Sequence, residues 1–261
     1  FLAGLWLAPF VCQKDSKIFR EHPDWLLLHD GKPWYCGSNW GGFYALDIDN
    51  AEFVRYLEQT FSLVLDDWGF DLVKLDFLYA AAPFGDARES RAGRMTRALE
   101  LLRRLCGDKL ILGCGVPLMP SFGLVDYCRI SCDVGLDWDN SLIMRHTNRE
   151  RVSTRQAIGN SISRRQLNGR AFGNDPDVFF LRESNIRLSE TDKYKLAVVN
   201  SLFGTLFLTS DNMGEYGSEA AALYERLRTL SERAENIRVD TDNGLTVYYD
   251  LEGTEQVLEI E

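Results

Sequence analysis

Two charged side chains, Lys74 and Asp76, interrupt the apolar segment 72–78. Their i, i+2 spacing places both side chains on one face of a strand. Such charges fit the carboxyl end of a strand in a parallel barrel, where a cation and a carboxylate meet a substrate. A purely structural ion pair is the alternative that this pattern leaves open.

A second cation and carboxylate, Arg129 and Asp133, lie at the end of the strand-like segment 124–133. Two carboxylates that face one pocket suit glycoside cleavage, in which one attacks the anomeric carbon and the other protonates the leaving oxygen. The nucleophile has to stay ionised, and the cation Lys74 favours the charged form of Asp76. We therefore predict that Asp76 is the nucleophile and Asp133 the general acid and base. Alternatively, Asp133 caps the next segment, and Arg129 contacts either Asp133 or a sugar hydroxyl.

Further residues are candidates for lining the same pocket. Cys114 lies between two glycines at a strand end, where a packing role is the alternative. Asp177 ends the polar segment 174–177, which could also be only a turn. Trp40 and Trp34 lie in a Gly-rich loop and serve either as sugar platforms or as loop anchors. Several aspartates could also bind a divalent metal, but no Glu/His ligand set accompanies them.

The elements that must position these residues alternate between strand-like and helix-like segments. This alternation predicts a parallel sheet with crossover helices. Polar residues gather at the strand ends, which favours a TIM-type (β/α)8 barrel over a doubly wound sheet. Six strands are counted, so the first two βα units of the barrel are expected to be missing. The expected strands are 3–10, 70–77, 110–115, 124–133, 171–177 and 205–210, the expected helices are 50–67, 86–106, 149–167, 189–203 and 218–235, and 11–49 is expected to be a long loop.

Residues 236–261 differ from the rest, because apolar and polar residues alternate on both sides of a turn sequence at 242–244. The predicted domains are therefore a partial catalytic barrel over 1–235 and the start of a C-terminal β-sheet domain over 236–261. Within the barrel, Asp49 is expected to cap the first helix. The arginines of the helix 86–106 are expected to form a solvated face.

Composition sets limits on partners and location. The 261 residues are 45% hydrophobic and 26% charged, which is ordinary for a globular protein with one large core. A formal net charge of -10 argues against nucleic acid and anionic membranes as partners. The apolar start, residues 1–10, is too short to span a membrane. Six cysteines without a CxxC pair indicate reduced thiols, which favours a cytoplasmic location, and three scattered histidines predict no zinc site.

Six motifs occur along the chain in the order in which one known family carries them. The sequence resembles the α-galactosidases of glycoside hydrolase clan D, most closely family 36, across about residues 10–212. A lone K-x-D motif would be weak support, whereas six motifs in order make the match specific. The motifs are Leu5-Trp6-Leu7-Ala8-Pro9-Phe10, His22-Pro23-Asp24-Trp25, Val73-Lys74-Leu75-Asp76, Gly113-Cys114-Gly115, Cys128-Arg129-Ile130-Ser131-Cys132-Asp133 and Asn174-Asp175-Pro176-Asp177.

The resemblance implies a retaining, double-displacement α-galactosidase that acts on terminal α-galactosides of the melibiose and raffinose type. It assigns Asp76 as the nucleophile and Asp133 as the acid/base. It implies that Lys74 and Arg129 bind galactose hydroxyls and that Cys114 lines the pocket floor. No cofactor and no metal are expected.

One family feature is expected to be absent. In the family, two adjacent aspartates on the second barrel strand grip galactose, and by the strand count that strand lies before Phe1. Asp66 and Asp67 are no substitute, because they lie at a helix end. The chain is thus expected to be a catalytic-domain fragment. A truncated, non-catalytic galactose-binding barrel and a galactosyl transferase of the raffinose-synthase type are the alternatives, and a homo-oligomer of the full-length protein is left open.

Overall fold

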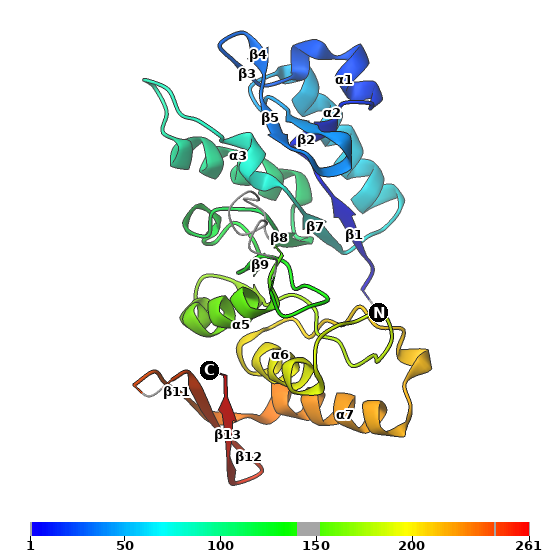
Figure 1. Cartoon of the computed structure of the whole chain (residues 1–261). Coiled ribbons are helices and arrows are strands. Elements are labelled where there is room, and N and C mark those ends of the chain that lie inside the picture. The colour runs from blue at the N-terminus through cyan, green and yellow to red at the C-terminus, as the bar shows by residue number, and fades with distance from the viewer. Residues whose placement is uncertain (1, 140–151, 243, 261) are drawn as a thin grey trace. The chain divides into compact units, whose positions relative to one another are not determined.

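A computed structural model of the chain describes residues 2–139, 152–242 and 244–260. The chain divides into two compact units, Phe1–Cys128 and Arg129–Glu261, which Figure 1 shows in blue to green and in green to red. Each unit is described by itself below.

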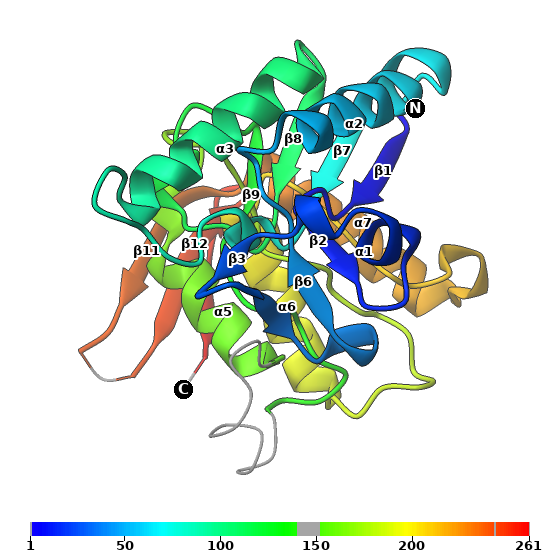
Figure 2. The same ribbon diagram turned by 90° about the horizontal axis from the view of Figure 1, so that it is seen from above.

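The first unit is built on parallel strands. They lie in the order β1 (Gly4–Leu7), β7 (Leu72–Leu75), β8 (Leu110–Gly113) and β9 (Tyr127–Arg129), and the last residue of β9 begins the second unit. Along β7, Val73 and Leu75 are buried while Lys74 is partly exposed, so the expected alternation of faces is present. Figure 2 shows α2 (Ala51–Ser62) and α3 (Arg91–Cys106) lying along one face of β1, β7 and β8. An α/β fold with a parallel sheet is therefore confirmed.

Helix α2 begins where its first N–H groups find a side-chain acceptor. Asn50 is the N-cap, and its side chain accepts hydrogen bonds from the N–H groups of Glu52 and Phe53. The expectation that Asp49 caps this helix is wrong, because the Asp49 carboxylate binds two arginines instead. A π-helical stretch, η3 (Leu63–Asp67), extends α2 to the predicted end of the helix.

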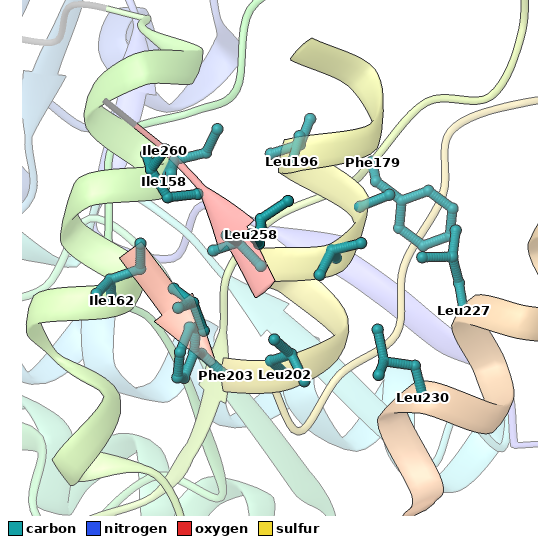
Figure 3. Packing of buried hydrophobic residues seen from close by; sticks show 14 of the residues in the cluster. Ile158, Ile162, Phe179, Leu196, Leu202, Phe203, Leu227, Leu230, Leu258 and Ile260 are labelled. Atoms are coloured by element: carbon teal, nitrogen blue, oxygen red, sulfur yellow. The ribbon is translucent and has the colours of Figure 1, made fainter. Parts of the chain in front are cut away.

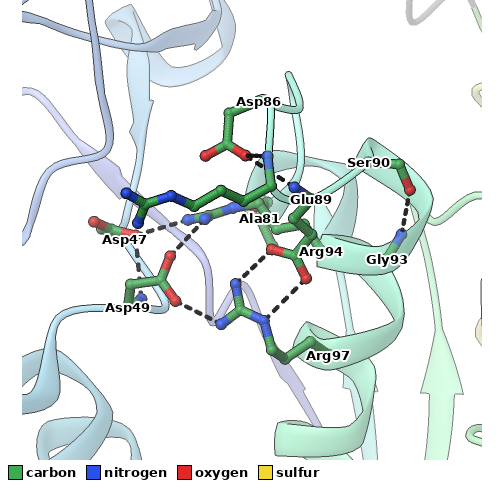
Figure 4. A network of polar contacts seen from close by, with 10 residues as sticks. Asp47, Asp49, Ala81, Asp86, Glu89, Ser90, Gly93, Arg94 and Arg97 are labelled. Atoms are coloured by element: carbon green, nitrogen blue, oxygen red, sulfur yellow. Dashed lines mark hydrogen bonds and ion pairs between the residues drawn. The ribbon is translucent and has the colours of Figure 1, made fainter.

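Both arginines, Arg94 and Arg97, come from α3, and Figure 4 shows their contacts. Arg94 binds Asp47 at 2.7 Å and Asp49 at 2.6 Å, and its Nε donates to the Ala81 carbonyl at 2.8 Å. Arg97 joins Asp49 to Glu89. The expected solvated face is wrong for Arg94, whose side chain is 14% exposed, whereas Arg97 is exposed at 44%. Both tie α3 to the turns that precede α2 and α3.

The segment 11–49 is not the long loop that was expected. It contains short elements, and β6 lies between β2 and β5 in an antiparallel sheet. Two- and three-residue strands are too short to show a period of two, which is why the sequence does not reveal them. These elements are β2 (Val11–Gln13), α1 (Lys17–Glu21), η1 (Pro23–Trp25), β3 (Leu28–His29), β4 (Lys32–Pro33), β5 (Tyr35–Gly37), η2 (Asn39–Gly41) and β6 (Phe43–Ala45).

The second unit packs helices against an antiparallel sheet. Its central strand β12 pairs with β11 and β13, which agrees with the β-rich C-terminal segment that was predicted. Figure 3 shows apolar side chains of both layers pointing toward one another. The boundary at 235/236 stays a prediction. The elements are α5 (Thr154–Ser163), β10 (Gly173–Asp175), α6 (Glu190–Phe203), α7 (Ser218–Arg233), β11 (Glu235–Asp240), β12 (Thr246–Leu251) and β13 (Thr254–Glu259).

Some predicted elements differ from the structure in this unit. The expected strand 205–210 is reduced to a single parallel bridge between Thr209 and Phe179. The expected helix 149–167 begins at Thr154, and its predicted first residues lie outside the described part of the chain. None of the described helices is both long and apolar enough to cross a membrane.

Candidate active site

Asp76 follows β7 directly, and its carboxylate is held from two sides. Its backbone N–H donates to the Leu7 carbonyl at 2.9 Å, which keeps it beside the end of β1. The Trp6 indole Nε1 donates to Oδ2 at 3.1 Å, and the Phe77 N–H donates to Oδ1 at 2.7 Å. Two donors on one carboxylate fix its orientation, as a nucleophile requires.

Lys74 lies two residues earlier on β7, beside Trp6 of β1 in the sheet register. Within the described ranges, Lys74 and Asp76 form no ion pair, so the purely structural pair that the pattern left open is wrong. The Lys74 side chain is partly exposed on the face where Asp76 lies. Its ammonium group can therefore donate to a bound ligand.

Aromatic rings form a wall next to Asp76. Trp6 is 46% exposed and Trp40 is 52% exposed, and their ring centroids lie 6.3 Å apart in an edge-to-face arrangement. Trp40 also contacts Phe77, the residue after Asp76, at 5.1 Å between centroids. A pocket of about 300 Å³ lies against this wall. It is lined by Trp6, Ala8, Val11, Gln13, Trp40 and Phe43.

Trp34 contributes nothing to this wall. Its ring packs against His29 and Phe84. Of the two tryptophans that were expected to act either as platforms or as anchors, Trp34 is an anchor and Trp40 is the exposed one.

Cys114 follows β8 and is buried, with 6% of its surface exposed. Its N–H donates to the Leu75 carbonyl at 2.8 Å, so it lies beside the strand that carries Asp76. The next residue, Gly115, has φ = 56°, and a Cβ there would lie 3.1 Å from the Phe77 nitrogen. Glycine at this position lets the chain pass close to the backbone of Phe77.

In the second unit, Arg129 is the centre of a cluster of carboxylates. Its side chain is only 4% exposed. Nη1 lies 2.7 Å from Asp133, Nε 2.8 Å from Asp175, and Nη2 2.8 Å from Asp177. Of the two contacts left open for Arg129, the one with Asp133 is present.

The carboxylates of this cluster differ in exposure. The Asp133 side chain is 65% exposed, whereas those of Asp175 and Asp177 are 0% and 10% exposed. Burial raises the pKa of Asp177, although the Arg129 guanidinium and the Val134 N–H oppose that change. Asp177 also has φ = 77°, which is rare outside glycine. The segment 174–177 is therefore more than a turn.

The predicted site residues fall into these two groups, one in each unit. Lys74, Asp76, Cys114 and Trp40 belong to the first, and Arg129, Asp133 and Asp177 to the second. No set of three or more His, Cys, Asp or Glu side chains in the described residues is arranged to hold a metal ion. No disulfide joins the six cysteines, all of which lie in the described part of the chain.

Comparisons with known proteins agree with these motifs. Residues 1–99 match the family model described as Melibiase. The α-galactosidase of Escherichia coli is 31% identical over 104 residues, which are 38% of this chain and 14% of that enzyme. The solved structure of TtGalA, the α-galactosidase of Thermus thermophilus, in complex with p-nitrophenyl α-D-galactopyranoside is 31% identical and has a TM-score of 0.79.

The chain is similar to family 36 α-galactosidases. Its similarity to TtGalA covers 98% of this chain and 51% of the TtGalA chain, so it spans about half the length of that enzyme. The family 36 enzyme AgaA of Geobacillus stearothermophilus, with 15% identity and a TM-score of 0.56, agrees in fold alone.

Sequence reasoning missed two residues of this α-galactosidase-like chain. Trp6 stands between two leucines in an apolar run, and so looks like a core residue. Asp175 was considered only as part of the polar segment 174–177 and was given no role of its own, although its side chain is fully buried against Arg129. For Trp6 a signal existed in the sequence, because the alternation of a strand puts it on the face opposite Leu5 and Leu7, and the structure places it beside Lys74.

Proposed function

We propose that the protein that carries this chain is a retaining α-galactosidase that removes terminal α-D-galactosyl residues from oligosaccharides. The observation that carries the proposal is the Asp76 carboxylate, held by two donors at the end of a parallel strand beside two exposed indoles. Its support is the similarity to TtGalA, whose structures hold p-nitrophenyl α-D-galactopyranoside and stachyose. The sheet would form part of a closed (β/α)8 barrel in the whole protein.

In the proposed mechanism, an oxygen of Asp76 attacks the anomeric carbon while the glycosidic C–O bond breaks. Asp133 gives its proton to the leaving oxygen, and a β-galactosyl ester of Asp76 forms. Asp133 then takes a proton from water, which attacks the same carbon and displaces Asp76. Two inversions release α-galactose, so the anomeric configuration is retained.

The surroundings of the two carboxylates suit these roles. Asp76 is aimed by the Trp6 indole and the Phe77 N–H. Asp133 is largely exposed and bound to Arg129 through Oδ1, while Oδ2 has no hydrogen-bond partner in the part of the chain described here. An acid/base needs such an accessible oxygen, because it must reach both the leaving group and water.

The remaining candidates are assigned to substrate binding. Lys74 would donate to a galactose hydroxyl, and buried Cys114 would lie at the floor beneath the sugar. The exposed face of Trp40 would stack on a sugar ring. The substrates would be small α-galactosides of the melibiose and raffinose type.

The first test is a pair of isosteric substitutions in the protein that carries this chain. Asp76→Asn should lower kcat on every α-galactoside by on the order of 10³-fold or more, because no nucleophile remains. Asp133→Asn should lower kcat/KM on melibiose by on the order of 10²- to 10⁴-fold, but much less on dinitrophenyl α-galactoside, whose leaving group needs no proton. Asp71→Asn, at the other end of β7, is the control and should keep normal turnover.

Native turnover by Asp76→Asn or by Asp133→Asn would refute these assignments. Proton NMR of the first sugar released should show α-galactose, and β-galactose in its place would exclude retention. Calorimetry with galactose separates the enzyme from a binding module. Binding without turnover would leave the chain as a galactose-binding barrel.

A further inference from the structure

A second pocket of the first unit plays no part in the proposed reaction. It has a volume of about 530 Å³ and lies between α3 and two short helical turns, η4 (Leu78–Ala81) and η5 (Met119–Ser121). It shares no lining residue with the pocket beside Trp6 and Trp40. Its volume falls within the range of about 300–1,000 Å³ that is typical of small-molecule sites.

The lining of this pocket is mainly apolar and suits a flat ring system. Tyr79, Pro117 and Pro120 contribute flat rings, and Met95 and Met119 contribute thioethers. Met95 is 1% exposed, whereas Met119 is 78% exposed. Methionine side chains adapt to the shape of a neighbour, and their sulfur atoms make favourable contacts with aromatic rings. An aromatic ligand would therefore find complementary surfaces here.

Backbone hydrogen bonds hold the walls of the pocket in place. The Tyr79 N–H donates to the Gly115 carbonyl at 2.7 Å, which ties η4 to the chain that leads to η5. Arg94 Nε donates to the Ala81 carbonyl at 2.8 Å, which ties η4 to α3. Because the walls are fixed before a ligand arrives, binding would cost little conformational entropy.

Arg91 supplies a positive charge at the edge of the pocket. Its Nε donates to the Ala82 carbonyl at 3.1 Å, and both residues line the pocket. Among the described residues, its two terminal nitrogens have no hydrogen-bond or ion-pair partner. Arg94 and Arg97, further along α3, are instead bound by carboxylates. The pocket lining includes no acidic side chain, so the Arg91 charge is available to a ligand.

We propose that this pocket binds a small aromatic anion, an aryl carboxylate or aryl sulfonate, with its rings among the methionines and prolines and its anionic group on Arg91. A guanidinium presents several donors in one plane, which matches the oxygens of such a group. The formal net charge of the chain is -10, which disfavours non-specific binding of an anion elsewhere. Binding would therefore depend on Arg91.

The experiment uses two fluorescent probes that have the same rings. Anilinonaphthalene sulfonate carries one negative charge, and phenylnaphthylamine is its uncharged counterpart. The protein that carries this chain should bind the sulfonate saturably, and biphenyl carboxylate should displace it. Galactose should not displace it, because no residue assigned to galactose lines this pocket. Displacement by galactose would place the probe in the site of the proposed reaction and would overturn the proposal.

Two substitutions separate the charge from the space. Arg91→Gln should raise the Kd of the sulfonate by about tenfold, because a charge-assisted hydrogen bond is lost, and should leave the Kd of the uncharged probe within about twofold. Ala92→Phe places a ring in the pocket and should remove most of the binding of both probes. Both residues are exposed, so both variants should fold, which urea unfolding checks.

Arg104→Gln is the matched control. Arg104 lies on the same helix, lines a different pocket and pairs with Glu58 at 3.1 Å. This variant should bind both probes as the parent does. An equal loss of sulfonate binding in Arg91→Gln and Arg104→Gln would reveal only a general attraction between charges. Unchanged binding in Ala92→Phe would show that the probes bind elsewhere, and either result would overturn the proposal.

Discussion

At the residue scale, the Trp6 indole makes a hydrogen bond that its place in an apolar strand does not suggest. Its Nε1 donates to the oxygen of Asp76 that the backbone leaves unoccupied. Each oxygen of Asp76 thus has one donor. Trp40 packs edge-on against Trp6 and makes no such bond to Asp76 in the described structure.

We therefore expect Trp6→Phe to lower kcat on the order of 10- to 100-fold on an aryl α-galactoside, since a hydrogen bond to a charged group is worth about 1.5–3 kcal/mol. Trp40→Phe is the matched control, and should raise KM for stachyose more than it lowers kcat. Steady-state kinetics on both substrates measure the difference. Equal losses of kcat in the two variants would mean that the indole N–H has no role in aiming Asp76.

How far the residues could be predicted depends on the kind of contact. Lys74, Asp76 and Asp133 were visible because a charge at the end of an apolar strand is costly unless it serves a purpose. The ion pairs of Arg129 with Asp175 and Asp177 were not, although these residues were expected at one pocket, because partners more than 40 residues apart in sequence cannot be paired from spacing. Only the fold brings those residues together.

At the element scale, the start of α2 shows how a cap is chosen. Asn50 and Asp49 are both good cap residues, and the sequence cannot rank them. The structure uses Asn50 because the Asp49 carboxylate is taken by Arg94 and Arg97. The long-range ion pairs of Asp49 thus determine which residue caps α2.

Replacement of this cap should have a measurable cost. Asn50→Ala should lower the free energy of unfolding by about 1 kcal/mol, since two N–H groups at the helix start lose their acceptor. Gln59→Ala, on the exposed face of the same helix, should stay within about 0.5 kcal/mol of the parent. Urea unfolding measures both. A cost for Asn50→Ala no larger than that of the control would show that the cap is dispensable.

Element length explains which parts of the fold were predictable. Helix 189–203 was placed within one residue of α6 (Glu190–Phe203), because a fourteen-residue apolar segment between Ser189, which caps its start, and Gly204 at its end is long and well bounded. The three-residue strands β2 and β6 could not be found in the same way. The segment 205–210 is apolar enough for a strand, yet it forms only a bridge at Thr209.

At the scale of the whole molecule, a formal net charge of -10 leaves many carboxylates to be accommodated. The first unit binds several of them to basic side chains. Burial disfavours ionisation of Asp49, but hydrogen bonds from Arg97 and Arg94 outweigh it and lower its pKa. A hydrogen bond from Arg97 lowers the pKa of Glu89, and one from Lys109 lowers the pKa of Asp71.

These shifts determine how stability depends on pH. A carboxylate whose pKa is lower in the folded state binds more protons when unfolded. Its contribution is fully present above the unfolded pKa, about 3.9 for Asp and 4.3 for Glu, and is lost as pH falls through the folded pKa. Asp177 acts in the opposite direction, because burial raises its pKa and protonation relieves that cost.

We therefore expect the free energy of unfolding to fall between pH 5 and pH 2, with the first unit losing protection from hydrogen exchange as its ion pairs are protonated. Arg97→Gln removes one of the two arginine partners of Asp49 and the arginine that binds Glu89. Arg94 still binds Asp49 in this variant, which should nevertheless be less stable than the parent at pH 7 and closer to it at pH 2, so its pH dependence is weaker. Arg20→Gln removes the same charge from an exposed position and should keep the parent's pH dependence. Parallel curves for Arg97→Gln and the parent would show that the ion pairs of α3 do not set the acid sensitivity of this unit.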